Sequence, residues 1–323
     1  MRMDPIKQMH NNISTTALTL PDGKENEISY MHFLSNRRLV LATLLGTISV
    51  LDYDLQSGSF ELLKTIDSRS IGAILMNIRV SVDEKYIFTA HGSQVSYSDN
   101  YVKFWDLDSL NCVNIIDGHA YPIQNLEQDF ISKQLIYSSG PSAIVWDIDS
   151  NQVVVSFNKH KKSISCISIS EINHRVYSTC KYKLFSWDMS NGEEVTSAKL
   201  PNTDKIGLSE NGDLFAIYAE REDQSYLQLI NNVDFHPLKS FYRDKPSKMR
   251  LCQGNDRHNY LLRFNSNWLE IVDLETLRPV INLLDFNRSP SCWAVFGSDL
   301  IAMNDSSDKK NTIHFYYQNW AEK

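Results

Sequence analysis

Short apolar runs recur along the chain at nearly constant spacing, and most end in a small polar residue. Three runs end in a tryptophan–aspartate pair, and the step between pairs is 41 residues, from 105 to 146 and from 146 to 187. A polar turn, such as 190–192, follows the pair and leads into another apolar run. β-Branched and aromatic runs separated by Gly, Asn, Asp and Ser predict strands joined by tight turns.

The same pattern continues on both sides of the three pairs in a degenerate form. Upstream, 47–52 has the same shape with Leu51 in the place of tryptophan, and an insertion separates it from the next unit. Downstream, the runs 226–231, 268–273 and 312–316 follow at steps of 42 or 43 residues. The pattern therefore predicts seven units, and a repeat step of about 40–45 residues indicates a repeat architecture.

These residues resemble the WD40 repeat family. The tryptophan–aspartate pairs match the end of its repeat, Gly118-His119 matches the start, and the resemblance runs from about residue 14 to residue 318. It implies an all-β fold, a seven-bladed WD40-type β-propeller with four strands in each blade around a central channel.

The two ends of the chain are expected to share the last blade. The last unit has too few residues for four strands, whereas 14–20 reads as a strand that lacks partners in its own unit. We expect this strand to enter the last blade and close the ring, which leaves no open sheet edge. The predicted organisation is a flexible tail over 1–13, one propeller over 14–318 and a short tail over 319–323.

The resemblance also implies a hydrogen-bonded chain in each blade, from a histidine through a serine or threonine and an aspartate to the tryptophan. Each such bond contributes about 1 kcal/mol net. No unit has all four residues: the third offers Ser138 or Ser139 but lacks the aspartate, the fourth carries Lys181 in that turn, and the second lacks a matching histidine. Apolar packing is therefore expected to dominate. The predicted structural residues are Trp105, Asp106, His119, Trp146, Asp147, His160, Trp187, Asp188 and Asp273.

Composition narrows the class of protein. The net charge of −7 gives no global support for nucleic-acid binding. The five cysteines are scattered without Cys-x-x-Cys spacing, which favours buried thiols in a reducing compartment over disulfides or zinc. No stretch is long and apolar enough for a signal region or a membrane span. We expect a cytoplasmic or nuclear protein that does not insert into a membrane.

Little in the sequence points to catalysis. It has no phosphate-binding glycine loop, metal-ligand spacing or nucleophile elbow, and no small-molecule substrate or cofactor is evident. Carboxylates at the starts of the innermost strands could converge at the channel mouth, but two among seven are too few for a site. The expected starts are Glu27, Ile71, Pro122, Ser163, Asp204, Ser247 and Ser289.

Charges sort by loop in this architecture. Loops between blades and after each second strand share one face, the top face; the remaining turns share the bottom face, where acidic residues predominate. The polar insertion 91–101 adds a second candidate contact element. The predicted partner-binding residues are Arg69, Tyr97, Tyr101, Tyr121, Lys159, Lys161, Lys162, Lys181, Arg243, Lys245, Lys248, Arg250 and Arg288.

A basic sector on the top face favours capture of an acidic or phosphorylated peptide, because lysine and arginine form charge-assisted hydrogen bonds with such groups. Plain solvated loops, and a tolerated insertion at 91–101, are the alternatives for these residues. The sequence predicts a non-catalytic protein–protein interaction scaffold, a subunit or adaptor of a multiprotein complex. An RNA-associated propeller subunit is the second hypothesis, and a propeller enzyme is the third.

Overall fold

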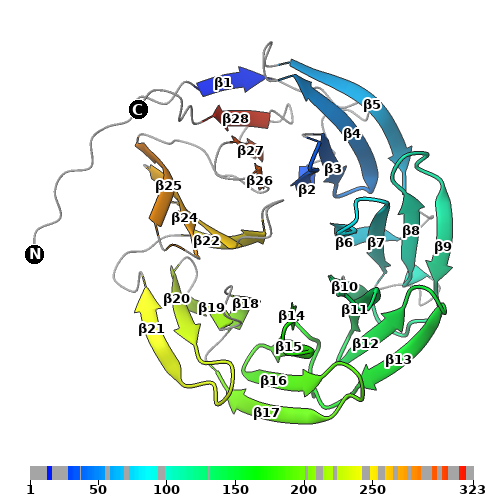
Figure 1. Cartoon of the computed structure of the whole chain (residues 1–323), viewed down its shortest axis with the longest axis vertical. Coiled ribbons are helices and arrows are strands. Elements are labelled where there is room, and N and C mark those ends of the chain that lie inside the picture. The colour runs from blue at the N-terminus through cyan, green and yellow to red at the C-terminus, as the bar shows by residue number, and fades with distance from the viewer. Residues whose placement is uncertain are drawn as a thin grey trace, which may run out of the picture.

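Within the residues that the structure describes, 28 strands form seven four-stranded antiparallel sheets arranged in a ring (Figure 1). The computed structural model describes residues 13–16, 28–36, 38–54, 59–68, 73–93, 99–129, 131–200, 203–208, 214–220, 224–241, 248–253, 259–264, 268–274, 276, 278–284, 293–296, 300–304 and 313–317. The seven-bladed propeller predicted from the repeats is therefore confirmed.

Each sheet is one blade, and its strands run in order from the ring axis outward (Figure 1). Blade 1 consists of β2 (Ile28–Phe33), β3 (Leu39–Thr43), β4 (Thr47–Asp54) and β5 (Ser59–Asp67), and blade 2 of β6 (Ile74–Val80), β7 (Tyr86–Gly92), β8 (Val102–Asp106) and β9 (Cys112–Ile116). Blade 3 consists of β10 (Ile123–Asp129), β11 (Gln134–Ser139), β12 (Ser142–Asp147) and β13 (Gln152–Phe157), and blade 4 of β14 (Cys166–Ser170), β15 (Arg175–Cys180), β16 (Lys183–Asp188) and β17 (Glu194–Lys199). Blade 5 consists of β18 (Thr203–Leu208), β19 (Leu214–Glu220), β20 (Gln224–Ile230) and β21 (Pro237–Phe241), blade 6 of β22 (Lys248–Gln253), β23 (Asn259–Phe264), β24 (Trp268–Asp273) and β25 (Arg278–Leu284), and blade 7 of β26 (Trp293–Phe296), β27 (Leu300–Asn304), β28 (Ile313–Tyr317) and β1 (Ile13–Thr16).

The ring closes through the N-terminal strand. β1 pairs antiparallel with β28, and the register runs from Ile13 opposite Tyr316 to Thr16 opposite Ile313. The strand expected over 14–20 thus already begins at Ile13, where a tail was predicted, and 17–20 lie outside the described residues. The rest of the tail predicted over 1–13, and the tail predicted over 319–323, also lie outside them. Backbone pairing between the two ends of the chain makes the last blade four-stranded.

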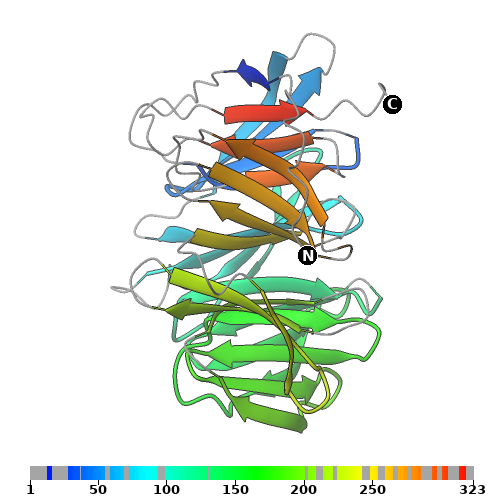
Figure 2. The ribbon, with the colours of Figure 1, turned by 90° about the vertical axis from the view of Figure 1, so that its left-hand side faces the viewer.

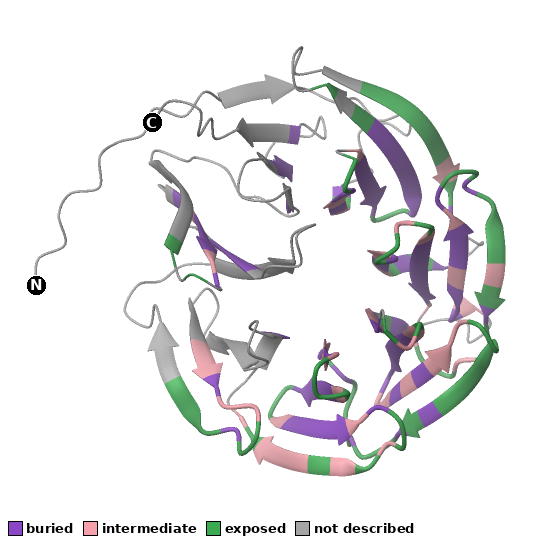
Figure 3. Cartoon of the chain, in the orientation of Figure 1, coloured by how far each residue is buried: buried purple, intermediate pink, exposed green. Residues whose placement is uncertain are grey.

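In blades 1 to 4, burial decreases from the middle strands to the rim. All five residues of β3 are buried, and β15 is buried after its first residue. The outer strand β13 instead has four exposed residues of six, and Figure 3 shows the same gradient across the described blades. A middle strand is covered on both sides by neighbouring blades, so a continuous apolar run such as 39–42 suits it.

Apolar clusters join one blade to the next. One cluster combines Val40 and Ile48 of blade 1 with Leu75, Ile87 and Trp105 of blade 2, and all five are buried. Similar clusters connect blade 2 with blade 3 and blade 3 with blade 4. The strands run roughly along the ring axis (Figure 2), so the turns that connect them lie on the top and bottom faces.

Candidate partner-binding site

Blade 4 holds a buried polar chain beneath its top loops. His160 Nε2 lies 2.7 Å from Ser178 Oγ, and Trp187 Nε1 donates to the same oxygen at 3.0 Å. Phe157 stacks on Trp187 with ring centroids 4.8 Å apart. Burial and the nearby Lys183 charge lower the pKa of His160 to about 4, so this histidine is neutral at neutral pH. The loop that carries His160 is thereby fixed to two strands of the blade.

Blade 2 builds the same contact from a different position. Trp105 Nε1 donates to Thr89 Oγ1 at 2.9 Å, and His91 Nε2 lies 2.9 Å from that oxygen. His91 belongs to β7 itself, whereas the repeat pattern expects its histidine in the loop before the blade. The second unit thus lacks a histidine at the expected position, but His91 takes its place and reaches the hydroxyl from two residues along the same strand.

Blade 3 lacks this chain because an aromatic residue occupies the hydroxyl position. In each blade, one residue of the second strand pairs with the tryptophan of the third strand. The residue two positions further along that second strand is Thr89 in blade 2, Tyr137 in blade 3 and Ser178 in blade 4. The prediction that Ser138 or Ser139 supplies the hydroxyl is therefore wrong. The position belongs to Tyr137, which comes one residue before Ser138 and two before Ser139. Ser138 Oγ instead accepts a hydrogen bond from Asn125 Nδ2 at 2.8 Å.

The polar atoms around Tyr137 lack partners. His119 meets the Tyr137 ring edge-on, with centroids 5.2 Å apart. Within the described part of the chain, His119 Nε2, the Tyr137 hydroxyl and Trp146 Nε1 are buried without a hydrogen bond. Blade 3 is thus held by ring packing where blades 2 and 4 use a shared hydroxyl.

The aspartates of the tryptophan–aspartate pairs fix the turns that follow them. Asp106, Asp147 and Asp188 each accept, through Oδ1, a backbone N–H two or three residues ahead, at 2.6–2.8 Å. Hydrogen bonds from the serines in these turns hold the pKa of all three carboxyls below the ordinary value. Asp273 makes a longer bond of the same kind, 3.3 Å from the Thr276 nitrogen.

Three lysines converge on the top face of blade 4. Lys161 and Lys162 are exposed in the loop before β14, and Lys181 is exposed in the β15–β16 turn. The loop that carries Lys162 lies next to the β15–β16 turn, because the Lys162 backbone donates a hydrogen bond to the Cys180 thiol at the end of β15. Burial raises the pKa of this thiol, and the Lys162 hydrogen bond and charge oppose the rise. Among the described residues, no carboxylate lies within ion-pair distance of these three lysines. Their charges therefore face solvent.

Lys159 differs from its neighbours. Its Nζ lies 3.0 Å from Glu194 Oε2, and this hydrogen bond lowers the pKa of the Glu194 carboxyl. A cation that is already paired contributes less to the capture of an external anion. We therefore expect Lys159 to position the loop through Glu194 and not to bind a partner.

Two exposed tyrosines flank the lysines. Tyr121 is 51% exposed, and its carbonyl accepts a hydrogen bond from Ser139 Oγ at 3.0 Å. Its ring lies against Gly140, where an added Cβ would come within 2.6 Å of the ring. Tyr182 is 50% exposed, and Lys181 Nζ lies 5.3 Å from its ring centroid. We name Tyr121, Lys161, Lys162, Lys181 and Tyr182 the lysine–tyrosine patch; sequence reasoning missed Tyr182, although an aromatic residue beside Lys181 in a tight turn is a usable signal.

The backbone places Lys181 in a conformation that favours glycine. Its φ is +40°, and Gly140, at the same position of the blade 3 turn, has φ +57°. A left-handed conformation costs a residue with a Cβ about 1–2 kcal/mol. Blade 4 keeps a lysine at a turn position where glycine is less strained.

The other predicted contact residues do not join this patch. Tyr101 is only 5% exposed and stacks on His91 with centroids 4.6 Å apart, so its assignment as a contact residue is corrected. Lys248 and Arg250 lie in β22, the innermost strand of blade 6, and not in the loop before it. The side chains of these two residues, and Arg69, Tyr97, Arg243, Lys245 and Arg288 as a whole, lie outside what the structure describes.

The described residues contain no group of three or more His, Cys, Asp or Glu side chains that could hold a metal ion. No helix in the described parts of the chain is long and apolar enough to cross a membrane.

Comparison with known proteins supports the fold. No protein-family model matches the chain. In a crystal structure of the mitotic checkpoint complex, one chain superposes with a TM-score of 0.71 over 98% of this chain and 95% of that one, at 11% identity. The chain has the fold of a WD40-type β-propeller. That likeness concerns the propeller fold alone.

Part of the propeller sequence resembles curated proteins. It is 26% identical over 120 residues to the CCR4-associated factor 4 homolog of Candida glabrata, covering 33% of this chain and 20% of the relative. It is 25% identical over 128 residues to human pre-mRNA-processing factor 17, covering 36% of this chain and 22% of the relative. The aligned region spans about a fifth of these relatives.

Proposed function

We propose that this propeller is a non-catalytic scaffold in a multiprotein complex, and that its lysine–tyrosine patch binds an acidic or phosphorylated segment of a partner protein. The observation that carries the proposal is the group of three exposed lysines, flanked by two half-exposed tyrosines; among the described residues, these lysines have no carboxylate partner. The proposal places the protein in the cytoplasm or the nucleus, where such complexes form.

The chemistry of the patch suits a peptide anion. Ammonium groups make short, charge-assisted hydrogen bonds to carboxylate and phosphate oxygens. Tyrosine side chains provide rigid contact area with little loss of rotamer freedom, which is why they are enriched where partners bind. Tyr121 is held over Gly140, and Gly140 accepts a backbone hydrogen bond from Ile164 at 2.9 Å. The patch is therefore built on fixed turns.

Binding of RNA is the second candidate, favoured by the resemblance to a pre-mRNA-processing factor. The acidic net charge of −7 opposes it, because RNA binding draws on a broad basic surface. The two candidates differ in their dependence on salt: each phosphate neutralised along a nucleic acid adds to the slope of log affinity against log salt. A short acidic peptide gives a shallow slope.

The test uses the whole chain and two variants of equal charge change. The patch variant is Lys161→Glu, Lys162→Glu and Lys181→Glu. The control is Lys64→Glu, Lys85→Glu and Lys133→Glu, which reverses exposed lysines elsewhere on the propeller. The probes are arrays of glutamate-rich peptides with a central serine or phosphoserine, and a single-stranded uridine oligonucleotide.

We expect the wild type and the control to retain the acidic and phosphorylated peptides with similar affinity. The patch variant should bind at least about tenfold more weakly, because hydrogen bonds to charged groups contribute about 1.5–3 kcal/mol each. Equal peptide affinity for both variants would overturn the site assignment. Preferential retention of the oligonucleotide, with a steep salt slope, would favour the RNA-associated function instead.

A further inference from the structure

The bottom face presents a regular series of aliphatic side chains that the proposed function does not use. In blades 2, 3 and 4 the second residue after the innermost strand is Val82, Ile131 and Ile172. These side chains are 37%, 65% and 76% exposed. Single exposed aliphatic residues are common on protein surfaces. Here, however, they recur at one structural position in three consecutive blades.

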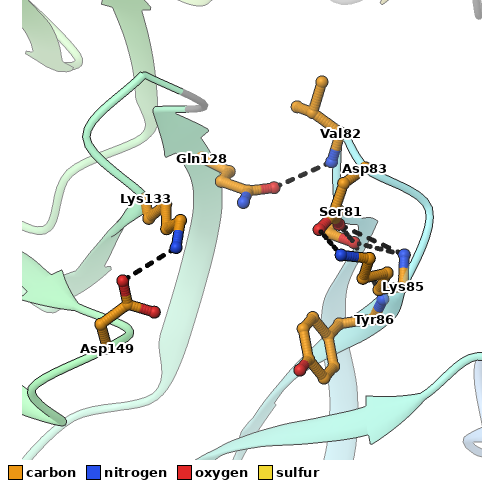
Figure 4. A network of polar contacts seen from close by, with 8 residues as sticks. All are labelled: Ser81, Val82, Asp83, Lys85, Tyr86, Gln128, Lys133 and Asp149. Atoms are coloured by element: carbon orange, nitrogen blue, oxygen red, sulfur yellow. Dashed lines mark hydrogen bonds and ion pairs between the residues drawn. The ribbon is translucent and has the colours of Figure 1, made fainter.

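Buried polar groups fix the turns that carry these side chains. Ser81 Oγ accepts hydrogen bonds from the backbone nitrogens of Lys85 and Tyr86, at 3.1 and 2.8 Å. Val82 N donates to Gln128 Oε1 of blade 3 at 3.0 Å, and its isopropyl group points away from this network (Figure 4). The turns therefore hold their tips in place against the neighbouring blade.

The turns of blades 3 and 4 are fixed in a similar way. Asp129 Oδ1 accepts a hydrogen bond from Ile131 N at 3.2 Å, and Ser170 Oγ accepts one from Asn173 N at 3.4 Å. The capping residues Ser81, Asp129 and Ser170 are all at most 4% exposed. The aliphatic side chain in each turn also lies two residues before one with positive φ, which is Glu84, Lys133 or His174 in blades 2 to 4.

The surroundings of the three side chains are acidic. In the described bottom turns of blades 2 to 4, carboxylates outnumber lysines by six to two. Both lysines already pair with carboxylates: Lys85 Nζ lies 3.6 Å from Asp83, and Lys133 Nζ lies 3.0 Å from Asp149 (Figure 4). The carboxylates in these turns are Asp83, Glu84, Asp108, Asp149, Glu171 and Glu193. Anionic lipids and nucleic acids would be repelled by such a surface, whereas a cationic protein segment would be attracted.

We propose that Val82, Ile131 and Ile172 form a docking row for a protein segment that carries aliphatic side chains flanked by lysines and arginines. The aliphatic groups of that segment bury the row, and its cations meet the carboxylates of the surrounding turns. The docking row lies on the face opposite the lysine–tyrosine patch. The propeller then takes partners of opposite charge on its two faces, and neither site depends on the other.

The test uses a synthetic leucine–lysine amphipathic peptide as the probe and a leucine–glutamate peptide of the same pattern as its counterpart. The row variant is Val82→Ser, Ile131→Ser and Ile172→Ser. The matched control is Val113→Ser, Ile115→Ser and Val153→Ser, which removes aliphatic groups that are 54%, 50% and 51% exposed on outer strands. Fluorescence anisotropy gives affinities, and methyl NMR of the labelled wild type locates the contact.

We expect the leucine–lysine peptide to shift the Ile131 and Ile172 methyl signals. It should bind the row variant at least about tenfold more weakly than the control, because the serines remove the apolar surface that the peptide buries. The leucine–glutamate peptide should leave these signals unchanged. Equal peptide affinity for the two variants would overturn the proposal. The proposal would also be overturned if, without peptide, the methyl signals of the docking row shifted as the protein concentration rises. The row would then contact a second copy of the chain. Thermal melting of both variants checks that the exposed substitutions leave the fold intact.

Discussion

Blades 3 and 4 are neighbours with the same strand order, yet they hold their tryptophans differently. In blade 4 one hydroxyl oxygen receives the Trp187 N–H and contacts His160. In blade 3 the tyrosine at the equivalent position leaves Trp146 Nε1 and His119 Nε2 without partners among the described residues. The comparison shows that ring packing replaces the shared hydroxyl without a change of fold. It also predicts that the two blades respond differently to the same substitutions.

The largest difference is expected from removal of the tryptophans. Trp187 is fully buried, so Trp187→Ala should destabilise the propeller by about 3–5 kcal/mol, the range for large aromatic truncations. Trp146 is only partly buried and its indole N–H makes no hydrogen bond within the described residues, so Trp146→Ala should cost clearly less. Urea unfolding of both variants measures the difference. Equal losses would show that the blade 4 chain adds nothing to aromatic packing.

The second test removes the central oxygen of each blade. Ser178→Ala leaves His160 Nε2 and Trp187 Nε1 without their acceptor or donor, and each buried unsatisfied group costs about 1–3 kcal/mol. Tyr137→Phe removes a hydroxyl that has no partner among the described residues, so stability should stay within about 0.5 kcal/mol of wild type or rise. Denaturant midpoints provide the measurement. A strongly destabilised Tyr137→Phe variant would reveal a partner for that hydroxyl.

Acid should weaken blades 2 and 4 more than blade 3. Burial and nearby lysine charges lower the pKa of His160 to about 4 and that of His91 to about 3, from an ordinary value of 6.5. The unfolded chain therefore takes up protons first, and stability falls as the pH drops from about 6.5 towards these values. The slope is at most about 1.4 kcal/mol per pH unit for each histidine.

Two variants isolate this acid effect. His160→Gln should reduce the slope of the unfolding free energy against pH between about 6.5 and 4, because one of the titrating histidines is gone while His91 remains. His119→Gln should change the profile less, since His119 is half-buried and the Asp117 charge counteracts the lowering of its pKa by burial. Urea unfolding at a series of pH values distinguishes the two. An unchanged profile for His160→Gln would contradict the assignment of a neutral histidine in blade 4.

The smallest effect concerns the turns of the lysine–tyrosine patch. Lys181→Gly should stabilise the propeller by up to about 1 kcal/mol, because glycine adopts positive φ without a Cβ clash. The same change should weaken peptide binding through loss of one cation. Gly140→Ala in blade 3 should destabilise, since the new Cβ meets the Tyr121 ring. Thermal melting resolves both signs, and a destabilised Lys181→Gly variant would contradict the strain argument.

The sequence was sufficient for the architecture because the repeat step and the burial of middle strands are periodic. Strand starts were predicted to within four residues for all seven innermost strands, and the closure of the ring through β1 is confirmed. The side-chain contacts were harder to predict. His91 was missed because its contact comes from within a strand, and the register of Tyr137 depends on pairing that a one-residue shift changes.

The candidate site shows the same limit. Sequence placed Lys161, Lys162 and Lys181 on one face, because loop assignment follows from strand order. It could not show that Glu194 pairs with Lys159, since that partner lies 35 residues away on an outer strand. Nor could it show that Tyr101 packs against His91 instead of facing solvent. Pairing and burial of individual charged or aromatic groups depend on contacts that repeat spacing does not encode.

A lysine footprint of the bound propeller tests whether the lysine–tyrosine patch is the binding site. The protein is acetylated with and without the phosphoserine peptide that binds most tightly, and the modification of each lysine is quantified by mass spectrometry. We expect protection of Lys161, Lys162 and Lys181, with Lys85 and Lys133 unchanged on the opposite face. Unchanged acetylation of the first three lysines, with protection elsewhere, would contradict it.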